Sequence, residues 1–117
     1  MKFKFENLQV WQRTMDLGET INQLGGQFPK KETYNLSSQS IRAADSVALN
    51  IAEGSIGQTN TEQRRFLSFS IRSLAEVVTC LHKAQRRKYI NQEDFSKLYS
   101  DCYTPLNMLI AFRNKIH

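Results

Sequence analysis

Apolar positions recur at helical spacing in four segments of the chain, and no segment alternates as a β-strand does. The first segment runs from about Asn7 to Leu24, and its seam consists of side chains three and four residues apart: Val10, Thr14, Leu17, Ile21 and Leu24. Gly25 and Gly26 follow, and glycine tolerates the left-handed conformation of a helix C-cap. We therefore expect a bundle helix that ends at these glycines.

The second segment, about Lys31 to Glu53, combines an apolar side with many serines and alanines. Small side chains allow a neighbouring helix to approach closely, so we expect this helix to be the most enclosed of the four. Gly54 is expected to close it. The stretch after it, residues 55–60, is the only polar, glycine-bearing connection longer than a tight turn.

The third segment, about Asn60 to Lys88, begins with the capping-box pattern Thr59-x-x-Glu62. Its apolar side chains spread over roughly 200° of the helix surface, whereas one core contact needs little more than about 100°. Either the helix is sandwiched inside the bundle or it packs on another subunit, and the sequence leaves both open. For an oligomer, we expect the subunit contact at or near three apolar side chains of this segment: Phe66, Phe69 and Ile71.

The fourth segment begins with Asn91 as a predicted N-cap. Pro105 lies inside its apolar pattern, where it removes a backbone hydrogen bond and clashes with the preceding turn, so we expect a kink near Asp101 and Cys102. Four helices of similar length joined by short loops predict an all-α fold, an antiparallel up-and-down four-helix bundle. We expect residues 1–117 to form this single domain.

Composition narrows the class of protein. The 117 residues are 40% hydrophobic and 23% charged, which is typical of one compact domain. Cys80 and Cys102 each lie in a helical pattern with no second cysteine nearby, which disfavours a disulfide scaffold or a zinc module. No apolar run is long enough to span a membrane, and the N-terminus lacks the apolar stretch of a signal peptide. We expect a soluble protein of the cytoplasm that does not bind membranes.

Signs of catalysis are absent from the sequence. His82 and His117 are the only histidines, and neither lies three or four residues from a cysteine or acid that could share a metal on one helix face. The chain has no phosphate loop, dinucleotide fingerprint or nucleophile elbow. We therefore expect no enzyme activity, no catalytic residue, no metal and no cofactor.

Two pairs of polar residues are candidates for a structural network. Glu53 lies in the last helical turn, the unfavourable end of the helix dipole for an acid, so we expect it to be held by a partner together with Asn50. The alternative is that this pair faces a ligand. Ser73 and Glu76 lie three residues apart beside the apolar arc of the third segment. We expect Glu76 at an edge or hydrogen-bonded to a facing helix, where it sets the register of packing.

Basic residues are the candidates for binding a partner. Sixteen Lys and Arg against eleven Asp and Glu give a net charge of +5, and the isoelectric point is about 9.4. Any exposed face is charged, so this charge permits a polyanionic partner without demanding one. We expect contact with RNA or DNA through the following residues: Arg64, Arg65, Arg72, Lys83, Arg86, Arg87 and Lys88.

A longer motif resembles a known family. It reads Phe28-Pro29-x-x-Glu32-x-Tyr34-x-Leu36-x-x-Gln39, then Arg42-Ala43-Ala44-x-Ser46-Val47 and Asn50-Ile51-Ala52-Glu53-Gly54. These residues resemble the 23S rRNA intervening-sequence proteins, also called four helix bundle proteins. The resemblance implies a left-handed bundle that assembles into a ring, typically a pentamer. It also implies similarity to the accessory variability determinant proteins of diversity-generating retroelements, which bind nucleic acid and engage a reverse transcriptase.

Two hypotheses of function follow. The first is a non-enzymatic homo-oligomer that binds nucleic acid by neutralising phosphates, with little sequence specificity. The alternative is a structural adaptor ring that recruits a protein partner such as a reverse transcriptase. Salt separates them, because phosphate binding weakens steeply as salt rises and a mainly apolar protein contact does not.

Overall fold

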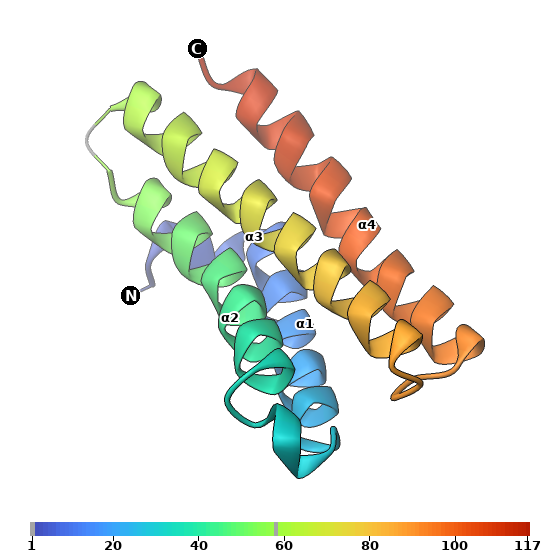
Figure 1. Ribbon diagram of the computed structural model, residues 1–117. Coiled ribbons are helices and arrows are strands. Elements are labelled where there is room, and N and C mark those ends of the chain that lie inside the picture. The colour runs from blue at the N-terminus through green and yellow to red at the C-terminus, as the bar shows by residue number, and fades with distance from the viewer. Residues whose placement is uncertain (1, 58) are drawn as a thin grey trace.

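The computed structural model describes residues 2–57 and 59–117, and within them it contains four α-helices and no β-strand (Figure 1). The helices are α1 (Gln9–Gly26), α2 (Leu36–Ser55), α3 (Asn60–Arg86) and α4 (Gln92–Lys115), with short 3-10 turns at η1 (Lys4–Asn7) and η2 (Lys30–Glu32). The prediction of an all-helical chain with four helices is confirmed. Met1 and Gln58, the latter in the expected polar loop, lie outside the described residues.

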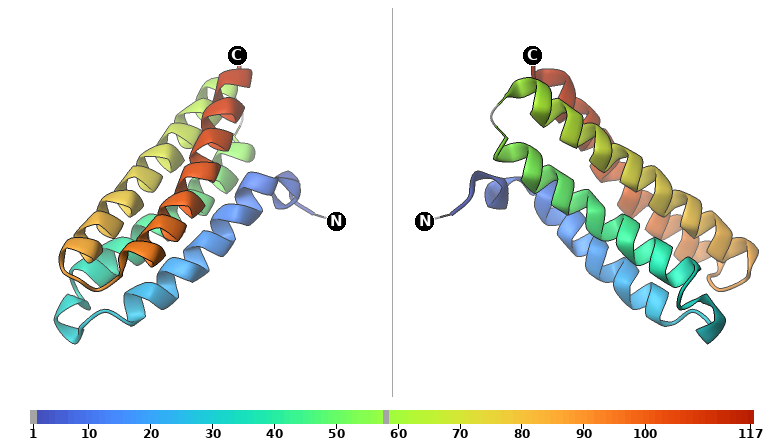
Figure 2. Two further views of the ribbon diagram at one scale, coloured as in Figure 1. Left: turned by 90° about the vertical axis from the view of Figure 1, so that its right-hand side faces the viewer. Right: turned by 60° about the vertical axis from the view of Figure 1, so that its left-hand side comes forward.

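The helices lie side by side in an elongated body of 43 × 23 × 22 Å (Figure 2). Helix α3 packs extensively against both α2 and α4, α1 packs mainly on α2, and the contact between α1 and α4 is the smallest of the four between neighbouring helices. Because α3 has neighbours on two sides, it needs a wide apolar surface. Sandwiching within one chain is therefore sufficient to account for the broad arc of α3. No helix in the described part of the chain is long and apolar enough to cross a membrane.

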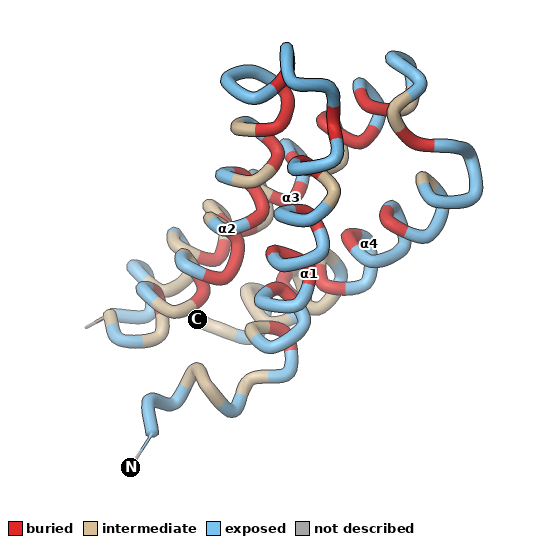
Figure 3. Tube along the Cα trace, turned by 90° about the horizontal axis from the view of Figure 1, so that it is seen from below, coloured by how far each residue is buried: buried red, intermediate tan, exposed pale blue. Residues whose placement is uncertain are grey.

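The core lies along the inward sides of all four helices (Figure 3). The expected seam of α1 is buried at four positions and half-buried at Leu24. Serines add hydrogen bonds between helices: Ser37 Oγ donates to the Gly25 carbonyl at 2.7 Å, and Ser70 Oγ donates to the Val47 carbonyl at 2.8 Å. These bonds satisfy hydroxyls that burial would otherwise penalise. Small side chains of α2 and α3 thus allow close packing and also join α2 to its neighbours.

The helices end where the glycines predict, since α1 ends at Gly26 and α2 at Ser55, but the expected left-handed glycine caps are wrong. Gly25 and Gly26 lie inside α1, Gly54 lies inside α2, and no described glycine has a positive φ. Two of these glycines instead make room for a neighbour. A Cβ at Gly25 would lie 3.0 Å from Ile41 Cδ1, and one at Gly54 would lie 2.8 Å from Phe66 Cβ. Close helix packing explains these two glycines, and backbone conformation does not.

The helix starts follow capping chemistry. Thr59 Oγ1 accepts a hydrogen bond from the Glu62 N–H at 3.1 Å, and Asn91 Oδ1 accepts one from the Asp94 N–H at 2.7 Å, so both predicted caps are confirmed. Helix α2 begins at Leu36 and not near Lys31, because a separate 3-10 turn precedes it. Helix α4 continues through Pro105, and the expected kink stays a prediction.

Helix α3 ends in a Schellman motif with an unusual residue. The Tyr89 N–H donates to the Ala84 carbonyl and the Lys88 N–H to the Gln85 carbonyl, which places Lys88 at the position that usually holds a left-handed glycine. Lys88 has φ of 65°, and among the described non-glycine residues it is the one with a positive φ. A side chain with a Cβ is strained in this conformation.

Lys88→Gly is expected to raise the free energy of unfolding by about 0.5–1 kcal/mol, because glycine relieves the left-handed strain. Chemical denaturation would measure the change. Lys88→Ala is the matched control, since it removes the same charge but keeps the Cβ. An equal gain in both variants would show that charge, and not backbone conformation, is responsible.

Candidate functional site

Four of the seven predicted nucleic-acid-binding residues share the outer face of α3. Arg65, Arg72, Lys83 and Arg86 are all exposed, and at 100° per residue they point within a narrow sector away from the core. We call these four residues the basic face. From the first to the last they span about 30 Å of helix. Arg65 also lies over the Phe69 ring, with 5.4 Å between the guanidinium carbon and the ring centroid.

Arg64 has a different position, since it contacts the end of α4. Its Nη1 donates to the carbonyls of Arg113 at 2.7 Å and Ile116 at 2.6 Å. Carbonyls in the last turn of a helix lack partners within the helix, so this guanidinium caps the C-terminus of α4. Arg64 therefore has an intramolecular role. A contact with nucleic acid is not needed to explain why an arginine occupies this position.

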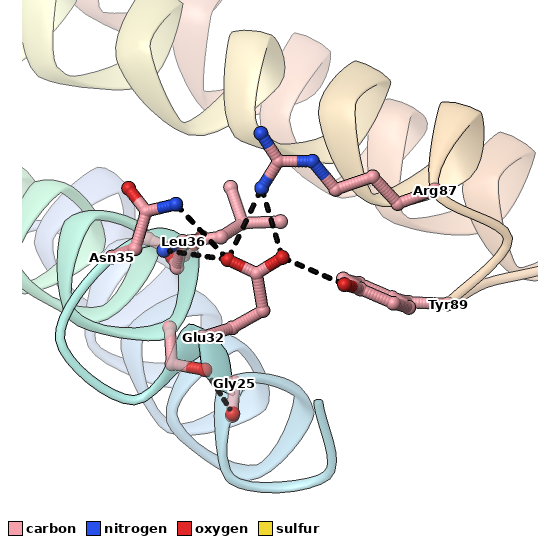
Figure 4. Close-up of polar contacts among 8 residues, drawn as sticks. Gly25, Glu32, Asn35, Leu36, Arg87 and Tyr89 are labelled. Atoms are coloured by element: carbon pink, nitrogen blue, oxygen red, sulfur yellow. Dashed lines mark hydrogen bonds and ion pairs between the residues drawn. The ribbon is translucent and has the colours of Figure 1, made fainter. Parts of the chain in front are cut away.

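Arg87 also has an intramolecular partner. Its Nη1 lies 3.1 Å from Glu32 Oε1 and 3.0 Å from Glu32 Oε2, and this is the only salt bridge among the described residues (Figure 4). Glu32 is only 4% exposed. Three further groups donate to the same carboxylate: the Tyr89 hydroxyl at 2.6 Å, Asn35 Nδ2 at 3.1 Å and the Leu36 N–H at 3.4 Å.

We call these five residues the Glu32 cluster. It joins the turn between α1 and α2 to the turn between α3 and α4 (Figure 4). The Tyr89 hydrogen bond is the largest cause that lowers the pKa of the Glu32 carboxyl; burial opposes it, while the Leu36 N–H and Arg87 add to the lowering. The same hydrogen bond, with burial, raises the pKa of the Tyr89 phenol. Every donor around the carboxylate thus favours its ionised form.

The predicted polar network is present only in part. Ser46 Oγ and Ser73 Oγ lie 2.8 Å apart and connect α2 to α3, and Asn50 Nδ2 donates to Ser46 Oγ at 2.9 Å and to the Ser46 carbonyl at 2.8 Å. Asn50 and Ser73 are therefore members, and Ser46 joins them. Glu53 and Glu76 are exposed, and neither forms an ion pair among the described residues. Both carboxylates lie at the surface, where no buried partner is required, so their membership of the network stays a prediction.

A polar groove lies beside this network. Its volume is about 610 Å³, and residues of α2, of α3 and of the turn before α2 line it, among them Tyr34, Gln39, Arg42, Ser46, Ser73 and Glu76. Glu76 thus lies at an edge, as one of the two expected placements has it. Arg42 and Glu76 share the groove without forming an ion pair. Five residues of the motif that resembles the family are therefore brought to one surface: Tyr34, Gln39, Arg42, Ala43 and Ser46.

Two apolar grooves flank the bundle. The first, about 440 Å³, lies between α1 and α2 and is lined by Phe5, Trp11, Met15 and Leu49 together with the acids Glu19 and Asp45. The second, about 410 Å³, lies between α3 and α4, and its lining includes Ile71, Ala75, Val78, Tyr99, Tyr103 and Leu106. We call the second one the aromatic groove. The two differ in charge, since acids line the first and no acid is among the described residues that line the second.

The three apolar residues expected at a subunit contact do not form one patch. Phe66 and Phe69 pack edge to face with 5.6 Å between their centroids, and Phe66 lies against Gly54 of α2. Ile71 lies on the other flank, in the aromatic groove beside α4. All three are half-buried within the chain.

Metal ligation has no support from side-chain clusters. Among residues 2–57 and 59–117, no group of three or more His, Cys, Asp or Glu lies close enough to hold an ion. His82 instead packs edge to face on Phe95, with 4.9 Å between the ring centroids.

The model of one protein family matches residues 6–111, which include the basic face, the Glu32 cluster and, apart from Phe5, the lining of both apolar grooves. The chain belongs to the 23S rRNA-intervening sequence protein family. A crystal structure of a protein with unknown function from the S23 ribosomal protein family of Bacteroides thetaiotaomicron is similar, with a TM-score of 0.84 and 20% sequence identity. The alignment covers 90% of this chain and 95% of that one, and it supports the fold alone. No curated protein matches the chain.

Sequence reasoning missed the Glu32 cluster as a site, although Glu32, Tyr34 and Leu36 all belong to the run that resembles this family. The sequence signal for this site was a single acid, Glu32. It lies between Pro29 and Leu36, the residue at which α2 begins. Its partners Arg87 and Tyr89 lie more than fifty residues later in the chain. The aromatic groove was missed too, although Tyr99 and Tyr103 are four residues apart and so share one face of α4.

Proposed function

We propose that this family member is a non-enzymatic, homo-oligomeric protein of the cytoplasm that binds RNA or DNA with little sequence specificity through the basic face of α3. One observation carries the proposal: four exposed cations share one face of a single helix, and none of them is ion-paired within the described residues. Unpaired cations on a rigid helix can neutralise phosphates without first losing an internal partner. The two free, buried cysteines support a reducing compartment.

The structure refines which predicted residues the proposal uses. Arg64 and Arg87 already have internal acceptors, so the binding surface consists of the basic face with Lys88 at its end. About four phosphate contacts per subunit correspond to a slope of about −4 for the logarithm of affinity against the logarithm of salt concentration. A ring would repeat this surface around its axis, and the avidity would rise with the number of subunits engaged.

Self-association is part of the proposal. The family resemblance favours an antiparallel, left-handed up-and-down bundle in a ring, typically a pentamer. We place the contact between subunits at two surfaces. One is the half-exposed pair Phe66 and Phe69. The other is the groove between α1 and α2, where Leu49 is 61% exposed and Met15 is 44% exposed. Sedimentation that finds only a 13.6 kDa species at micromolar concentration would overturn this part.

Charge reversal tests the binding surface. The double variant Arg72→Glu and Arg86→Glu is expected to weaken binding to generic RNA and DNA across sequences and to lower the salt slope by about two, one for each phosphate contact removed. The matched control is Lys4→Glu with Lys97→Glu, which changes net charge equally at exposed positions away from α3. Filter binding over a salt series measures both quantities. Equal effects of the two double variants would show that net charge alone acts, and wild-type protein that binds neither nucleic acid at low salt would refute the proposal.

The second candidate is an adaptor ring that recruits a protein partner such as a reverse transcriptase. The groove between α1 and α2 favours it, because exposed apolar side chains beside Glu19 and Asp45 suit a basic, apolar protein surface better than a polyanion. Binding to such a partner would persist at high salt, where phosphate contacts are lost.

A further inference from the structure

The aromatic groove borders the basic face, and this juxtaposition points to a more specific ligand. We propose that the groove between α3 and α4 holds the bases of a single-stranded nucleic acid whose phosphates lie on the basic face. The inference rests on the proposed function and adds to it the strandedness of the ligand. A duplex hides its bases in the stack, whereas a single strand offers them to aromatic side chains.

An aromatic ladder runs along this side of the molecule. The rings of His82 and Phe95 are 4.9 Å apart between centroids, those of Phe95 and Tyr99 5.9 Å, and those of Tyr99 and Tyr103 6.1 Å. The last two rings are nearly parallel, with 14° between their planes. Tyr99 is 40% exposed and Tyr103 51%, so both retain ring surface on which a base can stack.

Cations flank the ladder at two points of α3. Arg72 lies three residues before Ala75, which lines the groove, and Arg86 lies four residues after His82, which packs on Phe95. Residues three and four apart on a helix are neighbours on its surface, so Arg72 lies beside the groove and Arg86 beside the His82 end of the ladder. A strand whose phosphates follow these cations would have its bases within reach of Tyr99 and Tyr103.

The rest of the groove suits a base and does not repel a phosphate. The aliphatic side chains of Ile71, Val78 and Leu106 provide apolar contact. Burial, with the nearby charge of Asp101, raises the pKa of the Cys102 thiol to about 12, so this lining residue stays neutral. Asp101 itself lines a polar pocket on the α1 side of α4. The groove between α1 and α2, lined by two acids, lacks this complementarity to a polyanion.

Removal of the two rings tests the inference. The probes are a short oligouridylate and an RNA duplex with the same number of phosphates. The double variant Tyr99→Leu and Tyr103→Leu is expected to bind the oligouridylate about tenfold more weakly for each ring removed, since stacking on an aromatic side chain contributes this much per base. Its affinity for the duplex and the salt slope should not change, because no cation is lost.

The matched control is Tyr99→Phe with Tyr103→Phe, which keeps both rings and should keep the affinity for the oligouridylate. Thermal melts check that each variant folds. Full single-strand affinity in the leucine variant, or an equal loss on the duplex, would overturn the inference and leave the basic face as a binding surface. A change in sedimentation caused by the leucine variant would also overturn it, since the groove would then be a contact between copies of the chain. If wild-type protein binds neither probe at low salt, the proposed function fails as well.

Discussion

Glu32→Ala is expected to lower the melting temperature by about 10 °C, because it removes the acceptor of four separate donors at once. The loss leaves the buried Leu36 N–H and the Tyr89 hydroxyl without the partner that they have in the folded chain. It also removes the hydrogen bonds by which the cluster connects the turn before α2 to the turn before α4. Thermal melts followed by circular dichroism measure the effect.

Two comparisons isolate the cause. Glu53→Ala and Glu76→Ala remove the same type of side chain from exposed helical positions and should leave the melting temperature nearly unchanged. Arg87→Ala should have a smaller effect than Glu32→Ala, since the Arg87 side chain is 38% exposed and is one donor among four. A melting temperature for Glu32→Ala equal to that of the exposed controls would contradict the role assigned to the cluster.

The dependence of stability on pH follows from the same contacts. The pKa of the Glu32 carboxyl is lowered on folding, so its contribution is fully present above the unfolded value near 4.5 and is lost as pH falls through the folded-state value. The pKa of Tyr89 is raised above 10.0, so the neutral phenol contributes fully below that pH and less as pH rises through the folded-state value. Glu32→Gln keeps the shape of the side chain but does not ionise. It should therefore reduce the change in stability with pH on both the acidic and the alkaline side.

The helices could be predicted because each one has to bury a stripe of side chains. This requirement fixes the spacing of apolar residues such as Leu17 and Ile21, which lie four residues apart. The capping residues Thr59 and Asn91 were found for a similar local reason. The glycines were misjudged because a C-cap and a close helix contact both favour glycine. The packing of Gly25 against Ile41 and of Gly54 against Phe66, with no positive φ at either glycine, distinguishes the two reasons.

The candidate site was harder to predict because its decisive contacts are long-range. Arg64 and Arg86 look alike in the sequence, but one caps α4 and the other is exposed. The carbonyl acceptors at the end of α4 have no signature in the sequence, since every helix has them. The basic face, by contrast, could have been found from helical spacing, because Arg65 and Arg72 are two turns apart.

Gly54→Ala is expected to lower the free energy of unfolding by about 1–2 kcal/mol, although alanine is the better helix former. The added Cβ would lie 2.8 Å from Phe66 Cβ, and a Cβ cannot move without its backbone, so α2 and α3 would have to separate locally. Phe66→Ala should not rescue the variant, because alanine keeps the atom that clashes. Chemical denaturation measures the change.

Gly26→Ala is the matched control for this prediction. Gly26 also lies at the end of a helix, in α1, but a Cβ there would meet no atom within 4 Å. The same substitution should therefore raise the free energy of unfolding by about 0.5–1 kcal/mol through helix propensity. Opposite signs at the two positions would establish that Gly54 is needed for the approach of α3 to α2. A gain in stability at both positions would mean that the two helices can adjust to a Cβ, and that this contact tolerates a larger residue than the structure indicates.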